Sequence, residues 1–451
     1  MKKHLQNLLL RTTAVLLLTM GGIFSVQAQE LNTLWERSAR TGAEVGLPSW
    51  YTVGWVRGMD INGPNLYAAD RANTEIRVLN ATTGVDVTLT TPYDLTGVSG
   101  GTYAMNDLAF SDDGALFLGN LTVNASDTAI VNVNPFRLYW WNTEGGTYTD
   151  SLTFFTSAGH RIGDKISVVG SLTDNTVEVW MPAAGTDPGI IYVATTANQG
   201  TDWSVETITL SGDQDVIGTN ADVVPFDIGR TSDFYIAGNS SAPARYGNTG
   251  AFITGSQLSS SSRNGLDLFE ANEKTYLSVY TYRPEGVGSG AKTGRISIFD
   301  VTTTSTPELT FQTSLLGDDT DTFSSIYGEG KVMVNEDGSF NLYTLEGVNG
   351  FATFTNAAPP VEAEPSSVFI SEYIEGSGSN KAIEIYNGSG STVDLSNFRM
   401  YRANNGSATW QDTLNLSGSL ATGEFYIIAN PSADAAILAL ADTTDEITFY
   451  N

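Results

Sequence analysis

Short apolar stretches, separated by Gly, Asn and Asp, follow one another through most of this chain. Within them apolar and polar residues alternate, as in residues 65–70 (Asn-Leu-Tyr-Ala-Ala-Asp) and 75–80 (Glu-Ile-Arg-Val-Leu-Asn). Alternation with a period of two places apolar side chains on one face of a β-strand, and the separating residues favour turns. Helical periodicity is almost absent between Glu30 and Asn356. The sequence therefore predicts an all-β fold for this region.

A longer pattern recurs within the same region. Each copy begins with an apolar strand that holds an acid, passes through a Gly or Asn turn to an aromatic-rich strand, and ends with a third strand. The clearest copies begin at residues 57, 105 and 264, and weaker ones begin near 163, 221 and 323. Successive separations of 47, 57, 58, 45 and 57 residues join their marker positions, which are Asp60, Asp107, Asp164, Asp222, Asp267 and Ser324. A period near 50 residues is typical of β-propeller blades.

Six copies predict a propeller of six or seven blades, and we expect the strand at residues 31–37 to pair with the last blade. A string of β-sandwiches is the alternative, because short alternating strands occur in both architectures. The first copy, residues 58–70 followed by Ile76-Arg77-Val78-Leu79, resembles a repeat of the NHL-type propellers. The layout of the region is also similar to propeller domains of unassigned function in secreted bacterial proteins.

The C-terminal part carries a different pattern. Residues 368–376 (Val-Phe-Ile-Ser-Glu-Tyr-Ile-Glu-Gly), residues 381–388 and residues 393–398 (Val-Asp-Leu-Ser-Asn-Phe) resemble the bacterial lamin-tail domain. The resemblance implies an immunoglobulin-like β-sandwich over residues 368–451. Such a sandwich would need another strand after residues 446–450, so we expect this chain to be part of a longer protein.

Three prolines and two acids in residues 357–365 predict an extended linker at 357–367, after a propeller domain at 29–356.

The N-terminus predicts export. Lys2, Lys3 and Arg11 precede an apolar run at residues 14–24, and small residues follow up to Ala28, as in a secretory signal peptide at 1–28. The apolar run is shorter than a bilayer-spanning helix, so we expect cleavage, with a retained membrane anchor as the alternative. The mature protein, which has no other apolar run long enough to span a membrane, would then be secreted or held at the cell surface, outside the inner membrane.

Charge and composition exclude several function classes. A formal net charge of −28 would repel phosphate backbones, so we expect no nucleic acid among the partners of this region. The chain has no cysteine, which excludes disulfides, and its histidines are His4 and His160. A mature chain with one histidine cannot assemble a zinc site from His and Cys, and a Ser-His-Asp triad would have to use His160. We expect His160 to be a solvated loop residue.

The repeated acids allow two interpretations. If they begin inner strands, the side chains of Asp60, Asp107, Asp164, Asp222 and Asp267 converge on the central channel and would attract a cation. We favour the other interpretation, in which each carboxylate accepts hydrogen bonds from neighbouring backbone N–H groups.

Two acidic runs elsewhere suggest calcium. They are Asp318, Asp319 and Asp321 in one loop, and Asp213-Gln214-Asp215 in another. Neither run completes the twelve-residue calcium loop with its Gly and terminal Glu. Calcium is the cofactor that such loops would take, and no cofactor is firmly predicted.

These observations favour a binding protein over an enzyme, because no complete set of catalytic residues is present. We expect the propeller loops and the channel mouth to bind an extracellular ligand, such as a glycan or a surface protein, with the lamin-tail module as an accessory or adhesion domain. The aromatic runs at residues 139–141 and 280–282 would suit sugar stacking, but we expect them to pack between blades.

Two alternatives involve catalysis. The first is a carboxylate-dependent carbohydrate-active enzyme, because propellers can host glycosidases that need only two or three acids. Met105-Asn106-Asp107 is similar to the start of the sucrose-cleaving propeller enzymes, and this resemblance implies a nucleophilic role for Asp107. The second alternative makes the chain the N-terminal fragment of a larger secreted hydrolase or nuclease.

Overall fold

The structure is a computed structural model of the 451-residue chain. It describes residues 28–40, 43, 45–125, 134–154, 156, 159–212, 216–239, 241–255, 263–284, 293–303, 307–317, 327–357, 367–402 and 412–445. The chain divides into two compact units, residues 1–357 and 358–451. The predicted signal peptide and linker lie almost wholly outside the described residues. So do the proposed calcium ligands Asp318, Asp319 and Asp321, the run at 213–215 and the strand at 446–450.

The regular secondary structure of the described residues is nearly all β, as predicted. Their helices are η1 (Leu395–Asn397), a single 3₁₀ turn, and α2 (Ala435–Leu438). Neither of these two short helices could cross a membrane, and the described residues contain no helix that is longer.

Six sheets of three to five strands follow one another through the first unit. The first three contain β3 (Val56–Asn62), β4 (Asn65–Asp70) and β5 (Glu75–Asn80); β7 (Tyr103–Phe110), β8 (Leu116–Leu121), β9 (Phe136–Trp141) and β11 (Asp150–Phe154); and β12 (Arg161–Ile162), β13 (Ser167–Val169), β14 (Glu178–Ala184), β15 (Ile190–Thr196) and β16 (Trp203–Thr209). A two-stranded sheet of β6 (Tyr93–Asp94) and β10 (Gly146–Thr147) accompanies them.

The remaining three sheets repeat this antiparallel arrangement. They contain β17 (Asp222–Pro225), β18 (Phe234–Gly238), β19 (Ser241–Tyr246) and β20 (Phe252–Gly255); β21 (Arg263–Ala271), β22 (Lys274–Tyr282), β23 (Gly294–Asp300) and β24 (Glu308–Gln312); and β25 (Gly328–Val334), β26 (Phe340–Glu346) and β27 (Gly350–Thr355). Tight hairpins join some of the neighbouring strands. Asn272 and Glu273, at φ 50° and 63°, make the β21–β22 connection with two left-handed residues in succession, as a type I′ turn requires.

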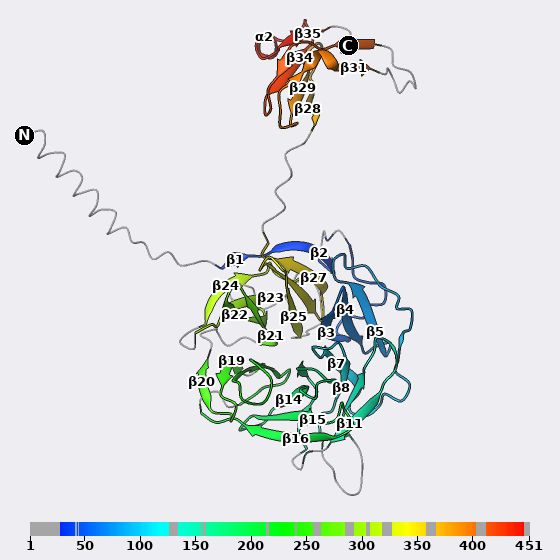
Figure 1. Ribbon diagram of the computed structural model, residues 1–451, viewed down its shortest axis with the longest axis vertical. Coiled ribbons are helices and arrows are strands. Elements are labelled where there is room, and N and C mark those ends of the chain that lie inside the picture. Colours follow the sequence, from blue (N-terminus) through cyan, green and yellow to red (C-terminus); the bar gives the residue numbers. More distant parts are fainter. Residues whose placement is uncertain are drawn as a thin grey trace, which may run out of the picture. The chain divides into compact units, whose positions relative to one another are not determined.

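The six sheets form a closed ring. Their inner strands contact one another in the order β3, β7, β13, β17, β21 and β25, and β25 contacts β3 again. Figure 1 shows this ring, in which the chain runs from the blue strands near β3 to the olive strands near β25. The first unit is therefore a propeller-like ring with its inner strands around a central axis, and a simple string of sandwiches does not describe it.

The N-terminal segment closes the ring. Strand β2 (Asn32–Ser38) pairs antiparallel with β27 and becomes the outer strand of the last sheet. The expected pairing of residues 31–37 with the last repeat is confirmed. The short strand β1 (Gln29–Glu30) runs parallel to β24, so the same segment also binds the preceding sheet.

The second unit is smaller. Its main sheet has the order β28 (Val368–Glu375), β29 (Lys381–Asn387), β34 (Phe425–Ala429) and β35 (Thr443–Thr444). Two further pairs accompany it, β30 (Val393–Asp394) with β33 (Ser419–Leu420) and β31 (Arg399–Arg402) with β32 (Asp412–Asn415). Ile383, Ile385, Leu395, Leu420 and Ile428 are buried together at its centre.

Candidate functional site: an arginine-lined pocket at one end of the ring

Four of the five predicted acids join neighbouring sheets. Each accepts a hydrogen bond from a backbone N–H of the next inner strand or of the segment beside it, at donor–acceptor distances of 2.7–2.8 Å. The pairs are Asp60 with Phe110, Asp107 with Ile166, Asp222 with Leu266, and Asp267 with Val332. These carboxylates therefore act as structural acceptors, as the favoured interpretation predicts.

Two residues that the sequence did not single out complete the remaining junctions. Glu329 Oε2 accepts from Met59 N at 2.8 Å and so joins the last sheet to the first. Ser167 donates its hydroxyl to the carbonyl of Val223 and joins the third sheet to the fourth. The sequence repeat placed its sixth marker at Ser324. In the structure Glu329, five residues later, makes the inter-sheet hydrogen bond that an aspartate makes in most of the other repeats.

Glycine permits the close approach of inner strands at two of these junctions. Gly58, at φ +41°, lies in a β-bulge of β3, and a Cβ there would come within 2.6 Å of the Cα of Asp107. Gly265, at φ +62°, lies in the corresponding bulge of β21, where a Cβ would come within 2.7 Å of the Cα of Glu329. The Gly-x-Asp spacing of the sequence repeat thus combines a bulge with an acceptor for the next sheet.

Asp164 departs from the pattern. Its carboxylate binds the guanidinium of Arg161 through two contacts, Nε to Oδ2 at 2.7 Å and Nη2 to Oδ1 at 2.5 Å. This hydrogen bonding raises the pKa of Arg161. The expectation that Asp164 is equivalent to the other four acids is therefore wrong, because the chain at this sheet uses Ser167 for the junction.

A buried polar network lies on the axis of the ring. Lys165 Nζ is 2.5 Å from Glu329 Oε2 and 3.4 Å from Asp107 Oδ1, and it donates to the hydroxyl of Tyr327 at 2.6 Å. Tyr327 in turn donates to Glu329 at 3.0 Å and accepts from the backbone N–H of Gly58. Burial lowers the pKa of Lys165, but the two carboxylates raise it above its usual value. The ammonium group neutralises acids that would otherwise repel one another inside the ring.

Asp107 is fully buried within this network. Burial raises its pKa, and both of its oxygens face protein donors. A nucleophile must reach the substrate, so this position does not favour the catalytic role that the similarity to sucrose-cleaving enzymes implies for Asp107.

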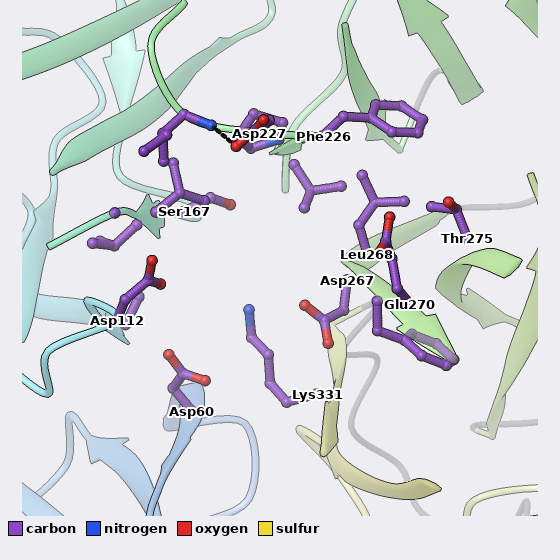
Figure 2. A pocket seen from close by; sticks show the side chains of 18 residues that line it. Asp60, Asp112, Ser167, Phe226, Asp227, Asp267, Leu268, Glu270, Thr275 and Lys331 are labelled. Carbon is purple, nitrogen blue, oxygen red and sulfur yellow. Dashed lines mark hydrogen bonds between the residues drawn. The ribbon is translucent and has the colours of Figure 1, made fainter. Parts of the chain in front are cut away.

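One cavity of about 380 Å³ lies where the inner strands end, and we call it the lysine cavity. Figure 2 shows Lys331 pointing into it between Asp60 and Asp267, with Asp112, Asp227 and Glu270 around the rim. Burial raises the pKa of Asp267 to about 7, while the neighbouring acids raise the pKa of Lys331 against the effect of burial. Within the described ranges, no three acids or histidines are grouped closely enough to hold a metal ion. The channel cation site stays a prediction.

A second cavity, of about 300 Å³, lies where the inner strands begin, and we call it the arginine pocket. Five of the six sheets, or the segments that lead into them, contribute to its wall. The lining residues are Arg57, Arg71, Thr102, Tyr103, Asn106, Leu121, Val123, Arg161, Asp164, Asn220 and Tyr327. Arg161 and Asp164 neutralise each other, so the wall keeps an excess of two positive charges.

Aromatic rings hold the two uncompensated guanidinium groups. The Cζ atom of Arg57 lies 4.5 Å from the ring centre of Tyr327, and that of Arg71 lies 4.0 Å from the ring centre of Tyr103. Arg71 also donates to the Asn106 side chain at 2.7 Å. Stacking on a ring face leaves the in-plane N–H groups of a guanidinium directed outward.

Neither guanidinium has a carboxylate partner among the described residues. Arg57 makes no side-chain hydrogen bond to them either, and its buried Nε lacks an acceptor there. Burial, and then the neighbouring charge of Arg57, lower the pKa of Arg71 to about 10. Two like charges are therefore held close together at the wall of a pocket, which is the electrostatic arrangement that an anion would relieve.

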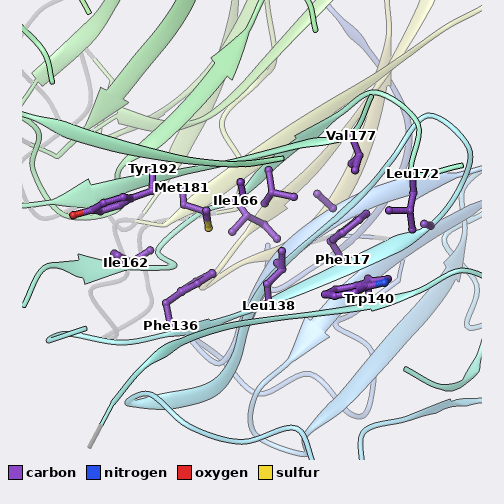
Figure 3. Close-up of a cluster of buried hydrophobic side chains, with 14 of the residues drawn as sticks. Phe117, Phe136, Leu138, Trp140, Ile162, Ile166, Leu172, Val177, Met181 and Tyr192 are labelled. Atoms are coloured by element: carbon purple, nitrogen blue, oxygen red, sulfur yellow. The ribbon is translucent and has the colours of Figure 1, made fainter. Parts of the chain in front are cut away.

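The aromatic runs pack between sheets, as expected. Tyr139, Trp140 and Trp141 are at most 2% exposed, and Tyr280 and Tyr282 are also buried. Figure 3 shows Trp140 with Phe117, Phe136 and Leu138 against residues of the next sheet, including Ile166 and Met181.

His160 lies in a loop but is half-buried, with Nδ1 2.8 Å from the hydroxyl of Tyr192 and a pKa lowered by burial. The expectation of a merely solvated histidine is therefore too simple.

Comparison with known proteins identifies the C-terminal part. The family model of the Lamin Tail Domain matches residues 362–451, which confirms that prediction. A comparison with curated protein sequences found no match. The resemblance of the first repeat to NHL-type propellers stays a prediction.

Several solved structures are similar to the chain. A DUF4623 family protein from Bacteroides eggerthii is 14% identical, with a TM-score of 0.50, over 73% of this chain and 77% of that one. A mutant of Trypanosoma rangeli sialidase is 9% identical, with a TM-score of 0.41, over 73% of this chain and 59% of that one. The GH43 protein BlXynB of Bacillus licheniformis is 11% identical, with a TM-score of 0.30, over 69% of this chain and 55% of that one. The first similarity indicates a shared fold and says nothing of activity, and the other two are too distant to inform on this chain.

Proposed function

We propose that this chain is an extracellular binding protein in which a six-bladed propeller binds an anionic ligand in the arginine pocket. The six sheets and their closed ring support the blade number. The sequence features of a signal peptide support export. The lamin-tail domain would serve as an accessory or adhesion module beside the propeller.

The uncompensated pair Arg57 and Arg71 carries the proposal. The chain has 50 acidic and 22 basic residues, so acidic partners are abundant, yet neither guanidinium is paired with a carboxylate among the described residues. Holding both charges at a partly buried wall is unfavourable, as the lowered pKa of Arg71 indicates. An oxyanion between them would accept hydrogen bonds from both groups and remove this repulsion.

The geometry favours binding over chemistry. Guanidinium groups bind carboxylate and phosphate through parallel N–H donors, but they cannot act as general bases near neutral pH. Among the described residues of the pocket wall the one carboxylate is that of Asp164, which accepts two hydrogen bonds from Arg161. The arrangement therefore provides recognition of charge and shape at the channel mouth.

Calorimetric titration of the full chain with sulfate, phosphate and glucuronate at low ionic strength tests this function. We expect at least one of these anions to bind, and Arg57→Ala to weaken binding about 10- to 100-fold, since hydrogen bonds between charged groups contribute roughly 1.5–3 kcal/mol. Arg295→Ala is the matched control, because Arg295 binds the side chain of Gln312 and does not line the pocket. Equal weakening by both variants, or no binding by the native chain, would contradict the proposal.

A carboxylate-dependent carbohydrate-active enzyme is the second candidate. The acids around the lysine cavity, Asp60, Asp112, Asp227, Asp267 and Glu270, are the observation that favours it, since the raised pKa of Asp267 suits a proton donor. Hydrolysis of an oligosaccharide that is lost in Asp267→Asn but kept in Arg57→Ala would support this candidate.

A further inference from the structure

An exposed tryptophan lies beside the arginine pocket. Trp55 is 39% exposed, and the other tryptophans of the described residues are half-buried or buried. Trp140, Trp141 and Trp180, by contrast, are at most 1% exposed. Leaving a large indole surface in water is unfavourable by roughly 25 cal/mol per Å² of apolar area, so the position of Trp55 calls for an explanation.

Trp55 is held in place by the same residues that form the pocket. Its ring meets that of Tyr103 edge-to-face, with centroids 5.8 Å apart and an interplanar angle of 90°. The Cζ atom of Arg71 lies 5.5 Å from its ring centre, and the backbone N–H of Arg71 donates to the carbonyl of Trp55 at 3.2 Å. Trp55 is not itself among the described lining residues, so a ligand held by Arg71 would reach the indole by extending past the guanidinium group.

The rest of the wall is suited to a ligand that carries hydroxyl groups. Among the described lining residues, Thr102 and Asn220 present hydroxyl and amide groups, and Leu121 and Val123 are the aliphatic ones. A flat aromatic acid would offer the side chains of Thr102 and Asn220 no hydrogen-bonding hydroxyl groups, whereas a sugar would. The volume of about 300 Å³ lies at the small end of ligand pockets and suits one or two sugar rings.

We infer that the ligand of the arginine pocket is an acidic sugar of the hexuronate type. Its carboxylate would lie between the guanidinium groups of Arg57 and Arg71, and the C–H face of its ring would pack on Trp55. This inference rests on the proposed function, because it assigns a chemical class to the same anion site.

The test compares glucuronate, glucose and inorganic phosphate as ligands of the full chain, by calorimetry and by tryptophan fluorescence. We expect glucuronate to bind at least about tenfold more tightly than phosphate, and glucose to bind weakly. Trp55→Ala should weaken glucuronate binding about three- to tenfold and leave phosphate binding unchanged, while Trp55→Phe should retain most of the affinity. Arg57→Ala should weaken the binding of both anions.

The outcomes separate the two claims. If phosphate binds as tightly as glucuronate and Trp55→Ala changes neither, the acidic-sugar inference is wrong while anion binding stands. If no anion binds and Arg57→Ala has no effect, both are wrong. The fluorescence of Trp55→Phe, compared with that of the native chain, shows whether the bound sugar quenches this particular indole.

Discussion

Each junction between neighbouring sheets of the ring includes a hydrogen bond made by a polar side chain of an inner strand. At four of them an aspartate accepts the backbone N–H of the next sheet, at a fifth Glu329 does so, and at the sixth Ser167 donates to a carbonyl. Burial raises the pKa of Asp60, Asp107, Asp222 and Asp267, and the backbone donors offset only part of that increase. Removing one acceptor would leave a buried N–H group without a partner.

Replacement of Asp222 tests this role. Asp222 is 3% exposed and accepts from Leu266 N at 2.7 Å. We expect Asp222→Ala to lower the free energy of unfolding by about 1–3 kcal/mol, the cost of an unsatisfied buried donor. Asp222→Asn, which keeps an acceptor oxygen, should lose less.

The control for this prediction is Asp112→Ala. Asp112 is exposed, and none of the side-chain hydrogen bonds of the described residues involves it, so we expect a change below about 0.5 kcal/mol. Chemical denaturation followed by tryptophan fluorescence measures both variants. Equal losses for Asp222→Ala and Asp112→Ala would show that the inter-sheet hydrogen bond contributes little.

The residues of the site were much harder to predict than the repeated acids. A repeat every 50 residues marks Asp60 or Asp267 because the same need recurs at each junction. Arg57 and Arg71 are not part of a repeated pattern. They stand out because no carboxylate of the described residues is paired with them, and only the distances in the folded chain reveal this. Asp164 illustrates a false match. It occupies a marker position of the sequence repeat, but in the structure its carboxylate forms an ion pair with Arg161.

At the scale of elements, strand β2 has the largest structural consequence. It supplies the outer strand of the last sheet through six register pairs with β27, and Trp35 Nε1 donates to the carbonyl of Ala81 at 2.8 Å in the first sheet. One strand from the start of the domain thus links the last repeat to the first. The expected closure of the ring by residues 31–37 predicted the pairing of this strand, and a spacing rule alone could not predict the additional pairing of β1 with β24.

Removal of β2 should open the ring. Compared with a chain that begins at Asn32, which already lacks β1, a chain that begins at Ala39 loses the backbone hydrogen bonds between β2 and β27 and exposes an edge of β27. We expect a loss on the order of 3 kcal/mol or more, from several backbone hydrogen bonds at about 0.5–1.5 kcal/mol each. Thermal unfolding by calorimetry measures the change, and an unaltered transition temperature would show that β2 does not close the ring.

At the scale of the whole molecule, the charge distribution is uneven. The chain carries a net charge of −28, yet one end of the ring axis has a wall with an excess of positive charge, while the lysine cavity at the other end is rich in acids. Anions would be repelled from most of the surface and attracted to the arginine pocket. Composition predicted the acidic surface but gave no sign of this local reversal, because two arginines hardly change a total of 72 charged residues.

The most direct test of the account is a crystal structure of the full chain with bound glucuronate. We predict electron density for the carboxylate between Arg57 and Arg71, with the sugar ring against Trp55. Density for the ligand in the lysine cavity beside Lys331, with the arginine pocket empty, would contradict it.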